Sequence, residues 1–180
     1  MSDPLHSSGG RHRLVVLRHA KSGWPPGVPD DERPLSGRGR RDALAAGEWL
    51  AAQGLLPDVV LCSPAARTRE TWSRVAKGLA GTGSVPEASF DEAIYDASLP
   101  TLRGVVRSID EGCRTALLIG HNPGMHDLVV DLADHEQETA RALAGASFPT
   151  SGIAVLEIGC AWADVSTGRA ALLEFAVPRG

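Results

Sequence analysis

Two arginines and two histidines follow short apolar segments of this sequence, and residues of these types can do chemistry together. They are Arg18 and His19 after residues 14–17, Arg67 shortly after residues 59–62, and His121 after residues 116–119. A guanidinium group can bind two oxygens of a phosphate at once and can offset the negative charge that develops during phosphoryl transfer. A neutral imidazole can act as a nucleophile and carry the phosphoryl group. The four side chains indicate phosphoryl-transfer chemistry, provided that the fold brings them together.

The apolar segments that precede these residues have the pattern of buried strands. Short continuous apolar runs are typical of a parallel sheet that is covered on both faces. In open α/β sheets, ligands bind beyond the carboxyl ends of the strands, which is where the arginines and histidines follow. Two later segments, 153–158 and 170–177, predict a hairpin or a pair of edge strands.

The segments between the strands have helical patterns. Ser36 is a suitable cap for a helix that runs to about Gln53, where Gly54 can end it. The residues expected on one face of this helix are Leu44, Gly47 and Leu50. Three further helices are expected to begin at Pro64, at Ser98 and at Asn122. This alternation predicts the α/β class, as a three-layer α/β/α sandwich with a mainly parallel sheet. Residues 22–36 and 81–90 are expected to be long loops.

Composition and charge exclude several classes of protein. The 180 residues, 43% apolar and 22% charged, are ordinary for one soluble globular domain. A net charge of −4 argues against a nucleic-acid binder or a membrane-surface binder. The scattered Cys62, Cys113 and Cys160 are more typical of reduced cytoplasmic thiols than of disulfides or a zinc site. No transmembrane segment or signal peptide is expected, and residues 1–12 are expected to form a disordered arm before a single domain, 13–180.

Four ordered motifs resemble those of a known family, the histidine phosphatase superfamily, in its SixA-like phosphohistidine phosphatase branch. The motifs are Arg18-His19-Ala20-Lys21, then Arg33-Pro34-Leu35-Ser36 with Gly39, then Ser63-Pro64 with Arg67 and Thr71, then Gly120-His121-Asn122-Pro123-Gly124. The resemblance covers about residues 13–132 and implies a phosphoglycerate mutase-like fold. One departure is Ala20, where much of the superfamily has Gly; we interpret it as a mark of the subfamily.

The resemblance also implies roles for individual residues. His19 would accept the phosphoryl group, Arg18 and Arg67 would bind its oxygens, and His121 would donate a hydrogen bond to it. Arg33 would be an additional phosphate ligand. Many members of the superfamily have a glutamate that protonates the leaving group, and Glu92 is the best match in position. Asp91 and Asp96 remain alternatives, and a phosphohistidine substrate needs this acid less, because imidazole leaves readily once protonated.

Other residues of reactive types have simpler interpretations. His6, His12 and His135 are expected to be solvated, and His126 is expected on a helix surface or in a loop. The histidines lack the spacing of metal ligands, so neither a metal nor another cofactor is expected. Trp24 could line a pocket or pack at its rim. The residues expected in packing roles are Trp49, Trp72 and Trp162, and those expected on a solvated helix face are Arg38, Arg40 and Arg41.

The sequence thus favours a metal-independent, cytoplasmic, monomeric phosphatase that acts on phosphohistidine or phosphomonoester substrates through a phosphohistidine intermediate on His19. Its partner would be a phosphorylated protein or a small phosphorylated metabolite. One alternative is a small-molecule phosphatase or a phosphoglycerate mutase-like enzyme, although a chain of 180 residues leaves little room for the insertions that enclose a sugar acid in such mutases. The other alternative is a phosphoprotein-binding module without turnover.

Overall fold

A computed structural model describes residues 11–180 of the chain, and within them six strands form one sheet in the order β3-β2-β4-β1-β5-β6. The strands are β1 (His12–Arg18), β2 (Val59–Cys62), β3 (Ala88–Phe90), β4 (Thr115–Gly120), β5 (Ile153–Ile158) and β6 (Ala170–Ala176). β1, β2, β3 and β4 run parallel, whereas β5 is antiparallel to both β1 and β6. The mainly parallel sheet is as predicted. The segments expected as a hairpin or an edge pair do pair with each other, but only β6 is an edge strand, because β5 also pairs with β1.

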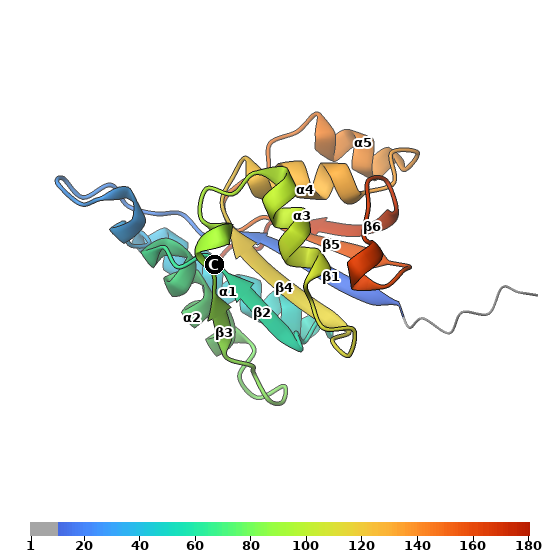
Figure 1. Ribbon diagram of the computed structural model, residues 1–180. Helices are drawn as coiled ribbons and strands as arrows, with labels where there is room; N and C mark the ends of the chain where they lie inside the picture. Colours follow the sequence, from blue (N-terminus) through green and yellow to red (C-terminus); the bar gives the residue numbers. More distant parts are fainter. Residues whose placement is uncertain (1–10) are drawn as a thin grey trace, which may run out of the picture.

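Helices cover both faces of this sheet, as Figure 1 shows. The helices on one face are α1 (Gly37–Ala52) and α2 (Ala66–Gly78), and those on the other are α3 (Leu99–Arg107), α4 (Gly124–Leu132) and α5 (Glu138–Ala144). Side chains of β1 alternate between the two resulting cores, because successive residues of a strand point to opposite faces. Leu14 and Val16 pack with the α3–α5 side, and Val15 and Leu17 with the α1–α2 side. The predicted three-layer sandwich is confirmed.

Helix α1 begins as its sequence predicts. The Ser36 side chain caps it by accepting a hydrogen bond from the Gly39 backbone N–H at 3.1 Å. α1 packs tightly on α2 at Gly47, where a Cβ atom would lie 2.2 Å from the Val75 carbonyl oxygen. The expected apolar face is wrong at one position, because Leu44 is 36% exposed.

Three other expectations about the elements are corrected. Residues 88–90 are an edge strand, β3, in a segment expected to be a loop. The second helix begins at Ala66 and not at Pro64, and helix α5 was not expected. β3 is three residues long with a serine at its centre, so its pairing with β2 depends on tertiary contacts and not on a local apolar pattern.

The boundary of the expected N-terminal arm also moves. Residues 1–10 of that arm lie outside the described residues. His12, which was expected to be solvated within the arm, starts β1 and is 7% exposed. It is buried because β1 pairs with β5 as far as the contact between His12 and Ile158. No helix within residues 11–180 has the length and hydropathy that a membrane crossing requires.

Candidate active site

The parallel strands bring the predicted residues to one edge of the sheet. Arg18, the last residue of β1, is in register with Gly120 at the end of β4, and the His19 backbone N–H donates to the Gly120 carbonyl at 3.0 Å. A cleft of about 190 Å³ opens at this edge, beside the loop 22–36 that projects from the sheet in Figure 1. Its lining residues are Arg18, His19, Lys21, Ser22, Trp24, Arg33, Arg67, His121, Asn122 and Thr150.

His19 is held in a single protonation state by its surroundings. Its Nδ1 lies 2.7 Å from the Ala20 carbonyl oxygen, and because a carbonyl oxygen only accepts, Nδ1 carries the ring proton. The pKa of His19 is lowered to about 4, chiefly by burial and also by the charges of Arg67, Arg18 and Arg33, while the Ala20 contact acts in the opposite direction. At neutral pH the ring is therefore uncharged and has its lone pair on Nε2.

His121 lies next to His19, with the two ring centroids 5.2 Å apart. Its Nε2 is 2.8 Å from the Ser63 hydroxyl, so the residue that follows β2 orients the residue that follows β4. Burial lowers the pKa of His121 to about 3, helped by the proximity of His19 and Arg67. The edge of the Tyr95 ring packs against His121 at a centroid separation of 5.4 Å. His121 is therefore also neutral at pH 7.

The three predicted phosphate-binding arginines all line the cleft, and each is fixed by hydrogen bonds to the surrounding chain. Arg18 donates from Nη1 to the Phe148 carbonyl at 2.8 Å, and burial lowers the pKa of its guanidinium. Arg67 donates to the backbone and the carboxylate of Asp30. Arg33 donates to Gly23, Asp30 and Ser22 and stacks on the Trp24 ring, 3.2 Å from its centroid. The cleft is therefore strongly cationic around a neutral imidazole, which suits a phosphoryl group.

The predicted acids lie elsewhere. Glu92 is exposed on the short helix η2 (Glu92–Ile94), and Asp96 is exposed after it. Asp91 caps η2 by accepting a hydrogen bond from the Ala93 N–H at 2.8 Å. Among the described residues, the lining of the cleft contains no aspartate or glutamate. The structure thus brings together the arginines and histidines but not the acid candidates.

Sequence reasoning assigned no role to four residues of the lining: Lys21, Ser22, Asn122 and Thr150. Lys21 and Asn122 lie within the quoted motifs and Ser22 directly follows one, so their position was available as a signal. Thr150 has no such signal. It enters the cleft because β5 runs antiparallel to β1, which places the chain before β5 beside the end of β1, where the Ser151 N–H donates to the Arg18 carbonyl at 3.2 Å.

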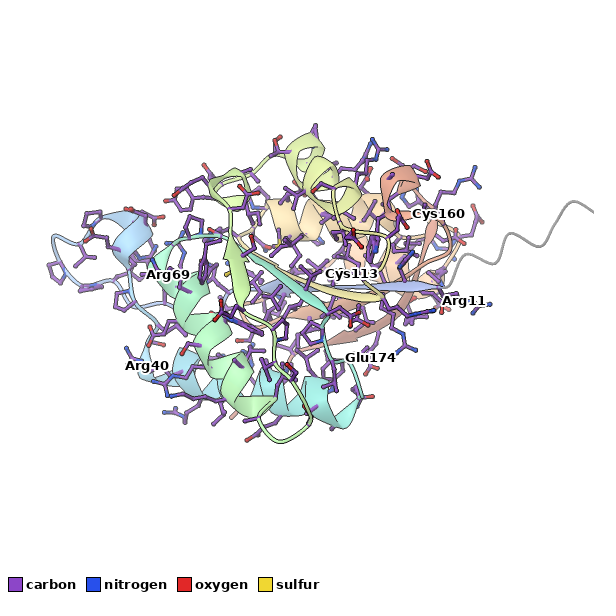
Figure 2. All side chains as sticks on the ribbon, turned by 60° about the horizontal axis from the view of Figure 1, so that its bottom comes forward. Arg11, Arg40, Arg69, Cys113, Cys160 and Glu174 are labelled. Atoms are coloured by element: carbon purple, nitrogen blue, oxygen red, sulfur yellow. The ribbon has the colours of Figure 1, made fainter. Side chains whose placement is uncertain are left out.

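The remaining candidate residues lie outside the cleft. His126 of α4 contacts the Leu143 carbonyl of α5 at 3.0 Å, and His135 is exposed, as expected. Trp72 and Trp162 are packing residues, with 8% and 0% exposure, whereas Trp24 is 75% exposed at the cleft. The cysteines are free thiols, and Figure 2 shows Cys113 and Cys160 away from Arg40 and Arg69. Within residues 11–180, no cluster of three or more His, Cys, Asp or Glu side chains could hold a metal ion.

Comparisons with known proteins agree with this geometry. A model of the histidine phosphatase superfamily (branch 1) matches residues 14–111, a span that includes His19, Arg33 and Arg67. An uncharacterised protein of Mycobacterium tuberculosis is 42% identical over 165 residues, which cover 91% of this chain and 100% of that protein. An uncharacterised chloroplastic protein of Arabidopsis thaliana is 30% identical over 84% of this chain and 69% of its own length.

Solved structures show the same likeness. A protein from Nakamurella multipartitia assigned as the phosphohistidine phosphatase SixA has a TM-score of 0.81 and 29% identity, over 94% of this chain and 97% of that one. A protein from Agrobacterium tumefaciens with the same assignment has a TM-score of 0.77 and 28% identity, over 93% and 98%. Since the superfamily model matches more than half of the residues and the relatives align along most of their length, this chain belongs to the histidine phosphatase superfamily, with the fold of its SixA-like branch.

Proposed function

We propose that the protein hydrolyses phosphohistidine through a covalent phosphohistidine on His19. In the first step His19 Nε2 attacks phosphorus, the bond from phosphorus to the substrate imidazole breaks, and that imidazole takes a proton from solvent. Arg18 and Arg67 bind the phosphoryl oxygens, Arg33 adds a third cation, and His121 donates a hydrogen bond. In the second step water attacks phosphorus and the bond from phosphorus to His19 Nε2 breaks. Inorganic phosphate leaves with the protons of that water, and His19 returns to its neutral form with the proton on Nδ1.

One observation carries this proposal: the contact from His19 Nδ1 to the Ala20 carbonyl, inside a cleft lined by three arginines. It selects the tautomer whose Nε2 lone pair is available, and the low pKa of about 4 keeps that lone pair free at neutral pH. A buried imidazole beside arginines is a poor cation but a competent nucleophile, and the arginines offset the charge of the group that it receives.

The cleft lining supports phosphohistidine over esters as the preferred substrate. An imidazole leaving group has a conjugate-acid pKa near 6.5 and needs no strong donor, whereas an alkoxide requires a proton from a positioned acid. The described lining contains no carboxyl group, and the nearby Asp30 is ionised at neutral pH, because hydrogen bonds from Arg33, Tyr95 and Arg67 lower its pKa to about 2. We propose that Glu92, exposed on η2, assists only phosphomonoesters, which are then slower substrates. The two SixA assignments among the relatives support the same preference.

We also propose the setting in which this activity operates. The two apolar cores share one sheet, which supports a single domain over residues 13–180, extended by His12 of β1. Three free cysteines support a reducing, cytoplasmic location. We propose that the protein acts as a monomer on a phosphorylated protein that reaches the cleft.

The test is a comparison of kcat/KM, in the presence of EDTA, for a phosphohistidine-bearing protein, free phosphohistidine and a panel of phosphorylated metabolites. We expect turnover that is insensitive to EDTA and a kcat/KM for phosphohistidine at least about tenfold above that for any alkyl phosphate. Preferred turnover of one sugar phosphate would transfer the assignment to the small-molecule alternative. Binding of phosphoprotein without release of phosphate would support the binding-module alternative.

A further inference from the structure

Asp30, which belongs to none of the sequence motifs, contacts three residues at or beside the cleft: Arg33, Arg67 and Tyr95. It begins the short helix η1 (Asp30–Glu32) inside the loop 22–36. Its carboxylate accepts hydrogen bonds from Arg33 Nη1 at 2.8 Å, from Arg67 Nη2 at 2.9 Å and from the Tyr95 hydroxyl at 2.9 Å. Its backbone carbonyl accepts another from Arg67 Nη1. One residue therefore connects two of the three cleft arginines.

These contacts leave Arg67 able to bind a phosphate. A guanidinium has five N–H donors in a planar fork. Asp30 occupies one on Nη1 and one on Nη2, so the Nε–H and a second N–H on each Nη remain. Asp30 and a phosphoryl group can bind Arg67 together, on different edges of the fork. The carboxylate fixes the plane in which the remaining donors lie.

Arg33 depends on Asp30 in part. Arg33 and Arg67 are almost completely buried, at 7% and 6% exposure. Asp30 accepts both of the hydrogen bonds that fix the Arg67 guanidinium, whereas Arg33 is also held by Gly23, Ser22 and the Trp24 ring. The carboxylate that orients both arginines is ionised at neutral pH, because the hydrogen bond from Arg33 and those from Tyr95 and Arg67 lower the pKa of Asp30 to about 2. Charge-assisted hydrogen bonds of this kind are stronger and more directional than neutral ones. Arg18 is different, since a backbone carbonyl holds it.

Asp30 also joins the two sides of the cleft. The Tyr95 hydroxyl that donates to Asp30 belongs to a ring whose edge packs on His121. The loop that follows β1, the helix that follows β2 and the segment that follows β3 therefore meet at one carboxylate. We propose that Asp30 is a positioning residue that aligns Arg67 and Arg33 for the phosphoryl group, a role that rests on the proposed phosphatase function.

The main test is Asp30→Asn, which keeps the size of the side chain and removes its charge. We expect kcat to fall about tenfold or more while KM changes less than threefold, because misaligned donors are missed most in the transition state. Inhibition by vanadate, which imitates the five-coordinate phosphorus, should weaken by a similar factor. Asp30→Glu keeps the charge and should recover part of the loss in kcat.

Two further variants calibrate this result. Asp31 is the next residue of η1, and its side chain is exposed. Asp31→Asn removes the same charge as Asp30→Asn and should leave kcat and vanadate inhibition within twofold of wild type. Tyr95→Phe removes one hydrogen bond to Asp30 and should lower kcat about threefold. Circular dichroism would confirm that each variant is folded, and the side chain of Asp30 is 53% exposed, so its replacement leaves the apolar cores intact.

The outcomes separate this proposal from the proposed function. If Asp30→Asn matches Asp31→Asn in kcat and vanadate inhibition, the positioning role is wrong. If Asp30→Asn binds vanadate more tightly than wild type, Asp30 competes with the anion and does not align its ligands, which also overturns the proposal. If wild-type protein forms no phosphohistidine on His19 in a single-turnover experiment, the proposed function fails before Asp30 is tested.

Discussion

His19 and His12 lie at the two ends of strand β1 and have much in common. They are 8% and 7% exposed, and in each the Nδ1 atom contacts a backbone carbonyl, Ala20 at 2.7 Å for His19 and Cys113 at 3.0 Å for His12. Burial and a fixed tautomer are therefore not sufficient to identify a nucleophile. In Figure 2 the label of Arg11, the residue before His12, marks the end of β1 at which His12 lies.

The two histidines differ in the groups around their remaining ring atoms. His12 Nε2 lies 3.3 Å from a carboxylate oxygen of Glu111, and its ring packs on Trp162 at 4.8 Å. A carboxylate at this position repels a phosphate. His19 instead shares its cleft with Arg18, Arg33 and Arg67. Two properties therefore distinguish the imidazole that can receive a phosphoryl group: the charge of the neighbouring groups, and a position at the carboxyl ends of the parallel strands.

The largest effect should come from exchanging each of these two histidines for alanine. His19→Ala should lower kcat by at least ~10⁴-fold and leave the fold intact, because it removes the nucleophile. His12→Ala should keep activity within about twofold and lower the free energy of unfolding by about 1–3 kcal/mol, through loss of buried contacts. Acid-labile, base-stable phosphate should be trapped on wild type and on His12→Ala but not on His19→Ala. Full activity of His19→Ala would reject the nucleophile.

Arginines inside and outside the cleft should respond differently to replacement by lysine. Arg18→Lys and Arg67→Lys keep the charge but lose the planar fork, which should slow kcat/KM roughly 30–150-fold, from ~2–3 kcal/mol of lost transition-state binding. Arg13→Lys, an exposed position on β1 outside the cleft, should have no measurable effect. Steady-state kinetics on phosphohistidine measures this, and near-wild-type rates in both cleft variants would mean that neither fork holds the phosphoryl group.

A smaller effect is expected outside the cleft at Glu92. Glu92→Gln should lower kcat/KM for an alkyl phosphate by about tenfold, below the ~10²-fold that a well-positioned acid contributes, because Glu92 is exposed. Hydrolysis of phosphohistidine should be unchanged. Asp91→Asn and Asp96→Asn are matched controls, and a selective loss in either of them would transfer the acid role to that residue. Equal losses on both substrates would refute the leaving-group argument.

The smallest effect should appear in the pH dependence of stability. The folded-state pKa of His19, about 4, lies below the ordinary value of 6.5, so the unfolded chain binds more protons between these values. The stability from a neutral, buried His19 is complete above pH 6.5 and is lost as the pH falls toward 4. Between pH 7 and pH 5 this single group should cost about 2 kcal/mol or less. Urea unfolding of wild type and His19→Asn should show a shallower decline in the variant, and identical slopes would contradict the low pKa.

Several elements of this protein could be predicted from local patterns. The apolar runs at 14–17, 59–62 and 116–119 became the three central parallel strands, because a strand buried on both faces needs an unbroken apolar sequence. Ser36 and Gly54 bracket α1 because capping is a property of a few adjacent residues. Edge strand β3 and helix α5 escaped prediction because their short sequences carry weak periodicity and depend on partners far along the chain.

The sequence by itself determined which side chains stand at the ends of the parallel strands, and with them the pairing of two arginines with two histidines. Only the tertiary structure decided their protonation states and the charges around them. The burial that makes His19 neutral, the return of the chain at Thr150 and the carboxylate of Asp30 across from Arg67 all come from segments distant in sequence. Desolvation and charge coupling act through space over a few ångströms, and no spacing along the chain encodes them.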